Sequence, residues 1–163
     1  MRLFIAIRLS DEMKKELTGT LHELKKAGVS GKYVPVQNLH LTLAFIGEME
    51  SAEPVKEALR GIKYKSFRLS LSELSAFGDI LHAGVKGNQG LSAAARAVRE
   101  ALDSAGIPYD RKKFVPHITL VRKAGGNWKR VPAPKGEMTV DKISLMKSQI
   151  KDGKPVYTEV FSV

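Results

Sequence analysis

Two four-residue stretches of this chain, His40-Leu41-Thr42-Leu43 and His117-Ile118-Thr119-Leu120, decide how the rest of it is interpreted. Both consist of a histidine, an apolar residue, a threonine and a leucine. The chain has only four histidines, and a shuffled chain of its composition would hold roughly 0.015 strings of His, any residue, Thr and Leu. Side chains alternate between the two faces of a β-strand. Each stretch, as a strand, therefore presents an imidazole and a hydroxyl on one face and turns two apolar side chains toward a core.

The similarity between the two parts of the chain extends beyond these motifs, which lie 77 residues apart. The same shift aligns an apolar strand at 3–6 with one at 80–83, and a helical stripe at 17–24 with one at 94–101. We interpret this as an internal duplication. It predicts an α+β fold of two lobes related by a pseudo-two-fold axis, each with antiparallel sheet and helices. The two motif strands would face each other across a central cleft.

Hydrophobic periodicity, capping residues and turn residues predict the individual elements. Strands are expected at 2–9, 33–36, 40–46, 67–71, 79–86, 115–122, 138–148 and 155–162. Helices are expected from Ser10 to Gly28, at 52–61 and at 88–105. Residues 123–137, rich in Gly, Pro, Lys and Arg, are expected to form a mobile basic loop.

Composition limits the class of protein. The chain is 43% hydrophobic and 27% charged, lacks cysteine, and has no apolar run near the roughly 18 residues of a membrane span. Residues 1–8 are too short and too charged for a signal peptide. We expect a single domain over 1–163 that is soluble, cytoplasmic and monomeric. The formal net charge of +10 favours polyanionic partners such as nucleic acid.

Two imidazoles can supply one neutral base and one protonated acid at the same time. In-line displacement at phosphorus needs such a pair on opposite sides of the phosphorus atom, with hydroxyls to hold the non-bridging oxygens. The chain has no cysteine, no His-x-His spacing, no phosphate-binding glycine loop and no dinucleotide fingerprint. We therefore expect acid–base catalysis without metal or cofactor. A strained 2′,3′-cyclic phosphate is the phosphodiester most easily cleaved this way, although histidine pairs also serve other phosphoesters.

The segments at 35–47 (PVQNLHLTLAFIG) and 114–122 (FVPHITLVR) resemble the two motifs of the two-histidine (2H) phosphoesterases. The start at 2–7 (RLFIAI) is similar to the opening strand of that family. The resemblance covers about residues 1–123. The subgroup that the chain most resembles is the bacterial and archaeal RNA 2′,3′-cyclic phosphodiesterases, also described as 2′-5′ RNA ligases.

This resemblance implies a bilobal α+β fold with the histidines in a central cleft. It implies hydrolysis of a terminal RNA 2′,3′-cyclic phosphate to a 2′-phosphomonoester without metal. By the family pattern, His40 is the proton donor to the leaving 3′ oxygen and His117 the base that activates water. Thr42 and Thr119 hold the phosphate, and Arg122 matches a basic residue of the second motif. A 5′-hydroxyl of RNA in place of water would give a 2′-5′ linkage.

Some residues keep two interpretations. Strict alternation places Arg122 on the face opposite His117, so it reaches the phosphate only if the strand ends or bulges before it. Otherwise it is a solvated basic residue. His82 is expected to be a hydrogen-bonded, partly buried histidine, and a contact in the cleft is its alternative interpretation.

Further candidates for RNA contacts are four aromatic residues that could stack on a base and two basic clusters that could follow the backbone. These are Tyr33, Phe77, Phe114, Trp128, 111–113 and 129–130. Core packing and solvated charge are their alternatives. For the whole chain, the alternatives are a non-catalytic RNA-binding module, or the same fold acting on small cyclic nucleotides or 2′-5′ oligonucleotides.

Overall fold

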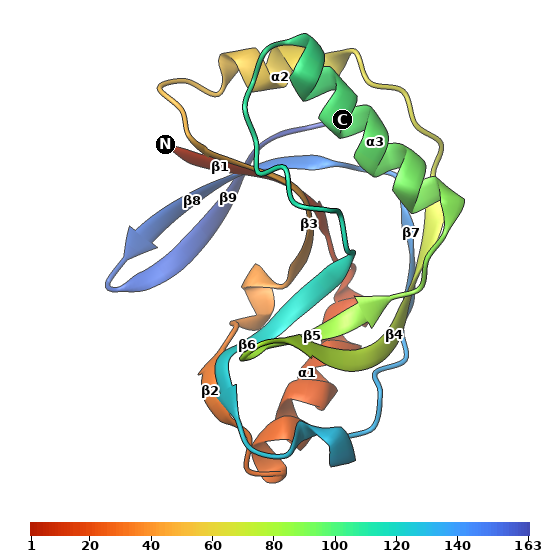
Figure 1. Cartoon of the computed structure of the whole chain (residues 1–163), viewed down its shortest axis with the longest axis vertical. Helices are drawn as coiled ribbons and strands as arrows, with labels where there is room; N and C mark the ends of the chain where they lie inside the picture. The colour runs from red at the N-terminus through yellow and green to blue at the C-terminus, as the bar shows by residue number, and fades with distance from the viewer.

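The computed structural model describes residues 1–163 and contains nine strands, three α-helices and two 3-10 turns (Figure 1). The strands are β1 (Arg2–Arg8), β2 (Ser30–Tyr33), β3 (His40–Glu48), β4 (Phe67–Phe77), β5 (Ile80–Val85), β6 (His117–Gly125), β7 (Glu137–Val140), β8 (Ser144–Lys151) and β9 (Lys154–Ser162). The helices are α1 (Asp11–Lys26), α2 (Glu53–Arg60) and α3 (Gln89–Ser104), and the 3-10 turns are η1 (Val36–Asn38) and η2 (Trp128–Arg130).

The strands form two antiparallel sheets with the orders β3-β1-β8-β9 and β2-β6-β5-β4-β7. The arrangement β3-β1-β8 in one lobe repeats as β6-β5-β4 in the other, which is the pseudo-two-fold relation expected from the sequence. Both motif strands are nine residues long and begin at their histidines, 77 residues apart. The expected α+β fold with two pseudo-symmetric lobes is confirmed.

The helices link the lobes. Helix α1 begins at the N-cap Ser10, whose hydroxyl accepts a hydrogen bond from the Met13 amide, and α3 begins at the corresponding cap Asn88. Although α1 follows β1 of the four-stranded sheet, it contacts β7 of the five-stranded sheet, whereas α3 packs beside α2 and against β3 (Figure 1). One cluster of 35 buried apolar residues runs through both lobes, so the cleft between the motif strands has a continuous core beneath it.

Three sequence predictions in the connecting segments are wrong. Instead of a strand at 33–36, the chain forms β2 and then turns at η1. Gly31, with φ of 136°, lets β2 approach β6 closely: a Cβ there would lie 2.7 Å from the Arg122 carbonyl oxygen. Pro35 then lacks the amide hydrogen that a continuing ladder needs.

The other two differences lie toward the C-terminus. The loop expected at 123–137 is partly ordered, because β6 continues to Gly125 and η2 follows. The single strand expected at 138–148 is two strands in different sheets, with β7 pairing β4 and β8 pairing β1. Strand pairing between residues so distant in sequence leaves no local signal. No helix of the molecule combines the length and hydropathy needed to cross a membrane.

Candidate active site

Both motif strands line one cavity of about 460 Å³ between the lobes. His40 and Thr42 come from β3, and His117 and Thr119 come from β6. In each strand the residues between and after these two are fully buried, so alternation turns the imidazole and the hydroxyl to the cavity. The structure thus brings the four motif residues to one place.

Each motif histidine is held by the same backbone contact. The Nδ1–H of His40 donates to the Asn38 carbonyl oxygen at 2.7 Å, and the Nδ1–H of His117 donates to the Val115 carbonyl oxygen at 2.7 Å. A carbonyl only accepts, so the proton of each neutral ring lies on Nδ1. Nε2 is therefore the unprotonated nitrogen of each neutral ring. That of His40 lies 2.9 Å from the Thr42 hydroxyl oxygen.

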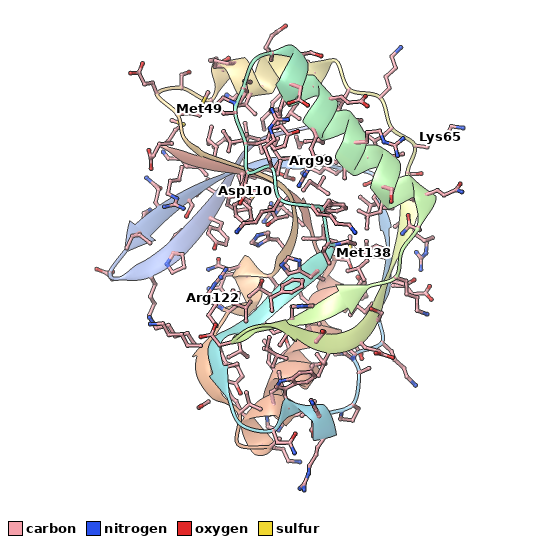
Figure 2. All side chains as sticks on the ribbon, viewed as in Figure 1. Met49, Lys65, Arg99, Asp110, Arg122 and Met138 are labelled. Carbon is pink, nitrogen blue, oxygen red and sulfur yellow. The ribbon has the colours of Figure 1, made fainter.

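Asn38 also fixes the approach to β3. Its side chain is buried and donates from Nδ2 to the Pro155 carbonyl oxygen of β9 at 3.0 Å. The backbone that orients His40 is thereby tied to the β8–β9 hairpin. Arg99 of α3 has a similar structural role, because it donates to the carbonyl oxygens of Leu43 and Lys112 at 3.3 and 3.0 Å (Figure 2).

Arg122 reaches the cavity through a β-bulge. Leu81 pairs with Val121 but His82 pairs with Thr119, so Leu120 is an extra residue in β6. Leu120 and Val121 are both buried, and the face of the strand changes between them. Arg122 therefore returns to the side of His117 and Thr119 and lines the cavity without any ion-pair partner (Figure 2).

A corresponding bulge in β3 directs a different side chain into the cavity. Ala6 pairs with Thr42 but Ile5 pairs with Ala44, so Phe45 returns to the cavity face. It is 53% exposed, although it is a large apolar residue. Phe45 is the counterpart of Arg122 after the 77-residue shift. The pseudo-symmetric site is thus chemically asymmetric, with a cation on one side and an aromatic ring on the other.

Each histidine packs against two other rings. His40 lies 4.9 Å from Phe4 and 5.4 Å from Tyr157, and the Tyr157 ring meets it edge-on at 88°. His117 lies 5.0 Å from His82 and 5.1 Å from Phe77, and Phe77 meets it edge-on at 89°. The distances are between ring centroids. Each imidazole is held by packing as well as by its carbonyl partner.

The site lowers the pKa of two histidines. Burial lowers the pKa of His40, and the positive charges of Arg122 and His117 act in the same direction against the raising effect of the Asn38 carbonyl. Burial, assisted by the charge of His117, lowers the pKa of His82 to about 4. His82 is only 4% exposed, and neither ring nitrogen has a hydrogen-bond partner. The expectation of a hydrogen-bonded, partly buried His82 is therefore wrong.

Two further hollows open from the central cavity. We call the first the His40 hollow; it has a volume of about 890 Å³ and is lined by β1, β3 and the β8–β9 hairpin, including Arg2 and Lys147. The second, the His117 hollow, has a volume of about 590 Å³ and includes Phe77 and Phe114. Arg122 and Phe45 line all three spaces.

The other sequence candidates are dispersed. Tyr33 lines the central cavity, whereas Trp128 packs against the core and lines none of the three spaces. Arg111 pairs with Asp103 outside them, and 129–130 also lie outside them. No three His, Cys, Asp or Glu side chains gather as a metal-ligand group.

Sequence reasoning missed Phe45 and Tyr157. For Phe45 the signal was present, because the shift that relates the motifs also places it on Arg122. For Tyr157 no local pattern marks a cleft residue, since its position depends on the pairing of β8 with β1 and β9.

Comparison with known proteins agrees with this geometry. A family model described as LigT like Phosphoesterase matches residues 7–86 and, a second time, residues 85–157. The chain belongs to the LigT-like phosphoesterase family. The double match is the duplication seen in the two lobes, and one histidine motif lies in each matched range.

Curated relatives within this family extend over the whole chain. The RNA 2′,3′-cyclic phosphodiesterase of Archaeoglobus fulgidus is 31% identical over 175 residues, covering 98% of this chain and 98% of the relative. That of Thermotoga maritima is 29% identical over 178 residues, covering 99% and 94%. Among solved structures, E. coli LigT complexed with 3′-AMP has a TM-score of 0.81 and 30% identity, covering 99% of this chain and 95% of that one. The LigT-like fold is therefore shared throughout.

Proposed function

We propose that this LigT-like chain is an RNA 2′,3′-cyclic phosphodiesterase that hydrolyses a terminal cyclic phosphate to a 2′-phosphomonoester by metal-independent acid–base catalysis. One observation carries the proposal: two Nδ1-anchored histidines from pseudo-symmetric strands line a single cavity beside an unpaired arginine. Relatives of nearly equal length that carry this activity in their names support it.

The reaction divides between the two imidazoles. His117 Nε2 takes a proton from water as the water oxygen bonds to phosphorus. The bond from phosphorus to O3′ breaks, and O3′ receives the proton of His40 Nε2. The backbone geometry of the two lobes is alike and does not tell the two histidines apart. We therefore take their roles from the family resemblance. The negative phosphate, once bound, favours the protonated form of His40 against the effects that lower its pKa.

The remaining polar groups hold the phosphate. Hydroxyls of Thr42 and Thr119 would bind the non-bridging oxygens, and the Arg122 guanidinium would bind two of them at once. Arg122 is suited to this role because it makes no ion pair that would have to break before it binds the phosphate. Charge that develops on the oxygens in the transition state would then be met by groups already in place.

The aromatic side of the cavity would receive the terminal nucleoside. Phe45 offers an exposed ring face, and Tyr157 lies at the wall formed by β9. A nucleobase can stack on such rings whatever its sequence identity. With this arrangement the base would lie on one side of the phosphate and the arginine on the other.

Ligation is a second candidate, favoured by the space beside His117. Water alone does not need a hollow of 590 Å³ on the nucleophile side. If a 5′-hydroxyl of RNA replaced water, His117 would take its proton and a 2′-5′ phosphodiester would form with no other change in the reaction. Gel analysis of RNA with a 5′-hydroxyl and a cyclic phosphate separates the two outcomes.

The test of the main proposal is turnover of an RNA that ends in a 2′,3′-cyclic phosphate, with excess chelator present. We expect a 2′-phosphate product, and we expect His40→Ala and His117→Ala each to abolish turnover while RNA still binds. Wild-type activity in both variants would exclude the acid–base pair, and binding without turnover in the unaltered protein would leave an RNA-binding module. Equal kcat/KM on 2′,3′-cyclic AMP and on a ten-nucleotide RNA would favour a small-molecule substrate.

A further inference from the structure

We propose that the RNA preceding the cyclic phosphate leaves the reaction centre through the His40 hollow, across Arg2 and the base of the β8–β9 hairpin, and that no part of the strand carrying the cyclic phosphate enters the His117 hollow. This rests on the proposed function. Both hollows are basic, so charge alone does not choose between them. The stereochemistry of the reaction does.

In a 2′,3′-cyclic phosphate, one ribose carries both O2′ and O3′. In-line attack places the nucleophile and the leaving O3′ at opposite ends of an axis through phosphorus. O2′ stays bonded at the equator, so the ribose lies between the equator and the leaving-group end. With His40 as the donor to O3′, the sugar and the whole attached chain lie on the His40 side.

The His40 hollow has the groups that such a chain needs. Arg2 lies on the same face of β1 as Phe4, whose ring packs on His40. Two residues of strand separate it from Phe4 by roughly 7 Å, about one nucleotide further from the phosphorus. In the β1–β8 ladder Arg2 is opposite Ser148, a hydroxyl that can bond to phosphate or a 2′-OH.

The charge of this hollow is available to a ligand. Arg2 makes no ion pair. The acidic residue in the wall, Glu48, is paired with the N-terminal ammonium of Met1 at 3.1 Å. The uncompensated groups lining the hollow are thus cationic, as a polyphosphate backbone requires.

The β8–β9 hairpin supplies the far wall. β1 pairs with β8 only as far as Ser148, and beyond that point the hairpin projects from its sheet (Figure 1). Gln149 and Ile150 continue the hollow along it, and Ile150 is 70% exposed. Such an exposed apolar side chain gives a splayed base an apolar surface to pack against.

The experiment compares two single variants that each remove one positive charge. Arg2→Gln alters the His40 hollow, and Lys113→Gln alters the His117 hollow. Each is assayed on a ten-nucleotide RNA with a 2′,3′-cyclic phosphate and on 2′,3′-cyclic AMP, which has no preceding nucleotide. The kcat/KM is measured over a range of salt concentrations.

We expect the first variant to lose kcat/KM on the RNA only, and the slope of log kcat/KM against log salt to become shallower by about 0.7 for each charge removed. The second variant should match the unaltered protein on both substrates. The inference is overturned if the second variant loses RNA activity, if both lose it equally, or if neither does. Failure of the proposed function is distinct, since the unaltered protein would then not turn over the RNA.

Discussion

Replacement of the buried His82 by phenylalanine should make the fold more resistant to acid. His82 lies between Phe77 and His117, with ring centroids 4.2 and 5.0 Å away, and its two nitrogens have no partner. A phenyl ring can occupy the same apolar surroundings without a group that gains charge. The effect of interest is the change in stability with pH, because any cost of fitting the larger ring is the same at every pH.

The magnitude follows from the pKa of His82, which falls from the usual 6.5 to about 4 in the folded chain. Below pH 6.5 the unfolded chain binds a proton that the folded chain refuses, so stability is lost as pH falls toward 4. Between pH 7.5 and pH 5 the loss from this one group is about 2 kcal/mol. That is a substantial fraction of the roughly 5–15 kcal/mol by which a folded domain is usually stable.

Urea denaturation at pH 7.5 and at pH 5 measures the difference, with the change in unfolding free energy compared between the two proteins. His82→Phe should lose about 2 kcal/mol less than the unaltered protein over this interval. His22→Gln is the matched control, since His22 is exposed on α1 and its removal leaves the core intact. Identical losses in all three proteins would show that the folded state protonates His82 as readily as the unfolded state, and the reasoning from burial would fail.

Four other substitutions, at three positions, test the site and its supports. Arg122→Lys keeps the charge but not the two-pronged donor, so kcat should fall roughly 100-fold; Arg122→Gln removes a charge that lowers the pKa of His40, so NMR titration should show that pKa rising. Unchanged kcat or an unchanged titration would place Arg122 outside the site. Phe45→Leu should weaken substrate binding by about 1–3 kcal/mol through KM, with kcat kept, and an unchanged KM would argue against stacking. Gly31→Ala should destabilise the fold by about 1–3 kcal/mol in urea, because its Cβ would clash with the Arg122 carbonyl oxygen; wild-type stability would contradict that contact.

The fold was predictable from sequence wherever it depended on local pattern. Helices α1 and α3 carry both a capping residue and an apolar stripe, and the motif strands carry the period of two. The 77-residue shift predicted the two lobes because duplicated elements keep their order. It could not predict that β8 joins the sheet of β1, since that pairing depends on which sheet edge is open after the lobes assemble.

The residues of the site likewise divide into those that local sequence pattern predicts and those whose position depends on strand pairing. The period of two in a β-strand was enough to predict that the histidine and the threonine of each motif share one face, because both precede the bulge. Arg122 depended on a bulge, and a bulge is set by how two strands pair rather than by the strand that contains it. The condition that Arg122 needs a bulge was nevertheless available from sequence, because strict alternation placed it on the wrong face.

The two bulges show how a symmetric frame could support the asymmetric reaction proposed for it. Duplication supplies two equivalent imidazoles, and equivalence alone gives no reason for one to donate and the other to accept a proton. Beyond the bulges the two strands differ, because β3 presents Phe45 to the cavity and β6 presents Arg122. In the proposed reaction, an aromatic ring favours the nucleoside and a guanidinium favours the anionic oxygens, so the bound ester would have one orientation. That orientation would turn the leaving oxygen toward His40, and the seating of the substrate would then assign the acid and the base.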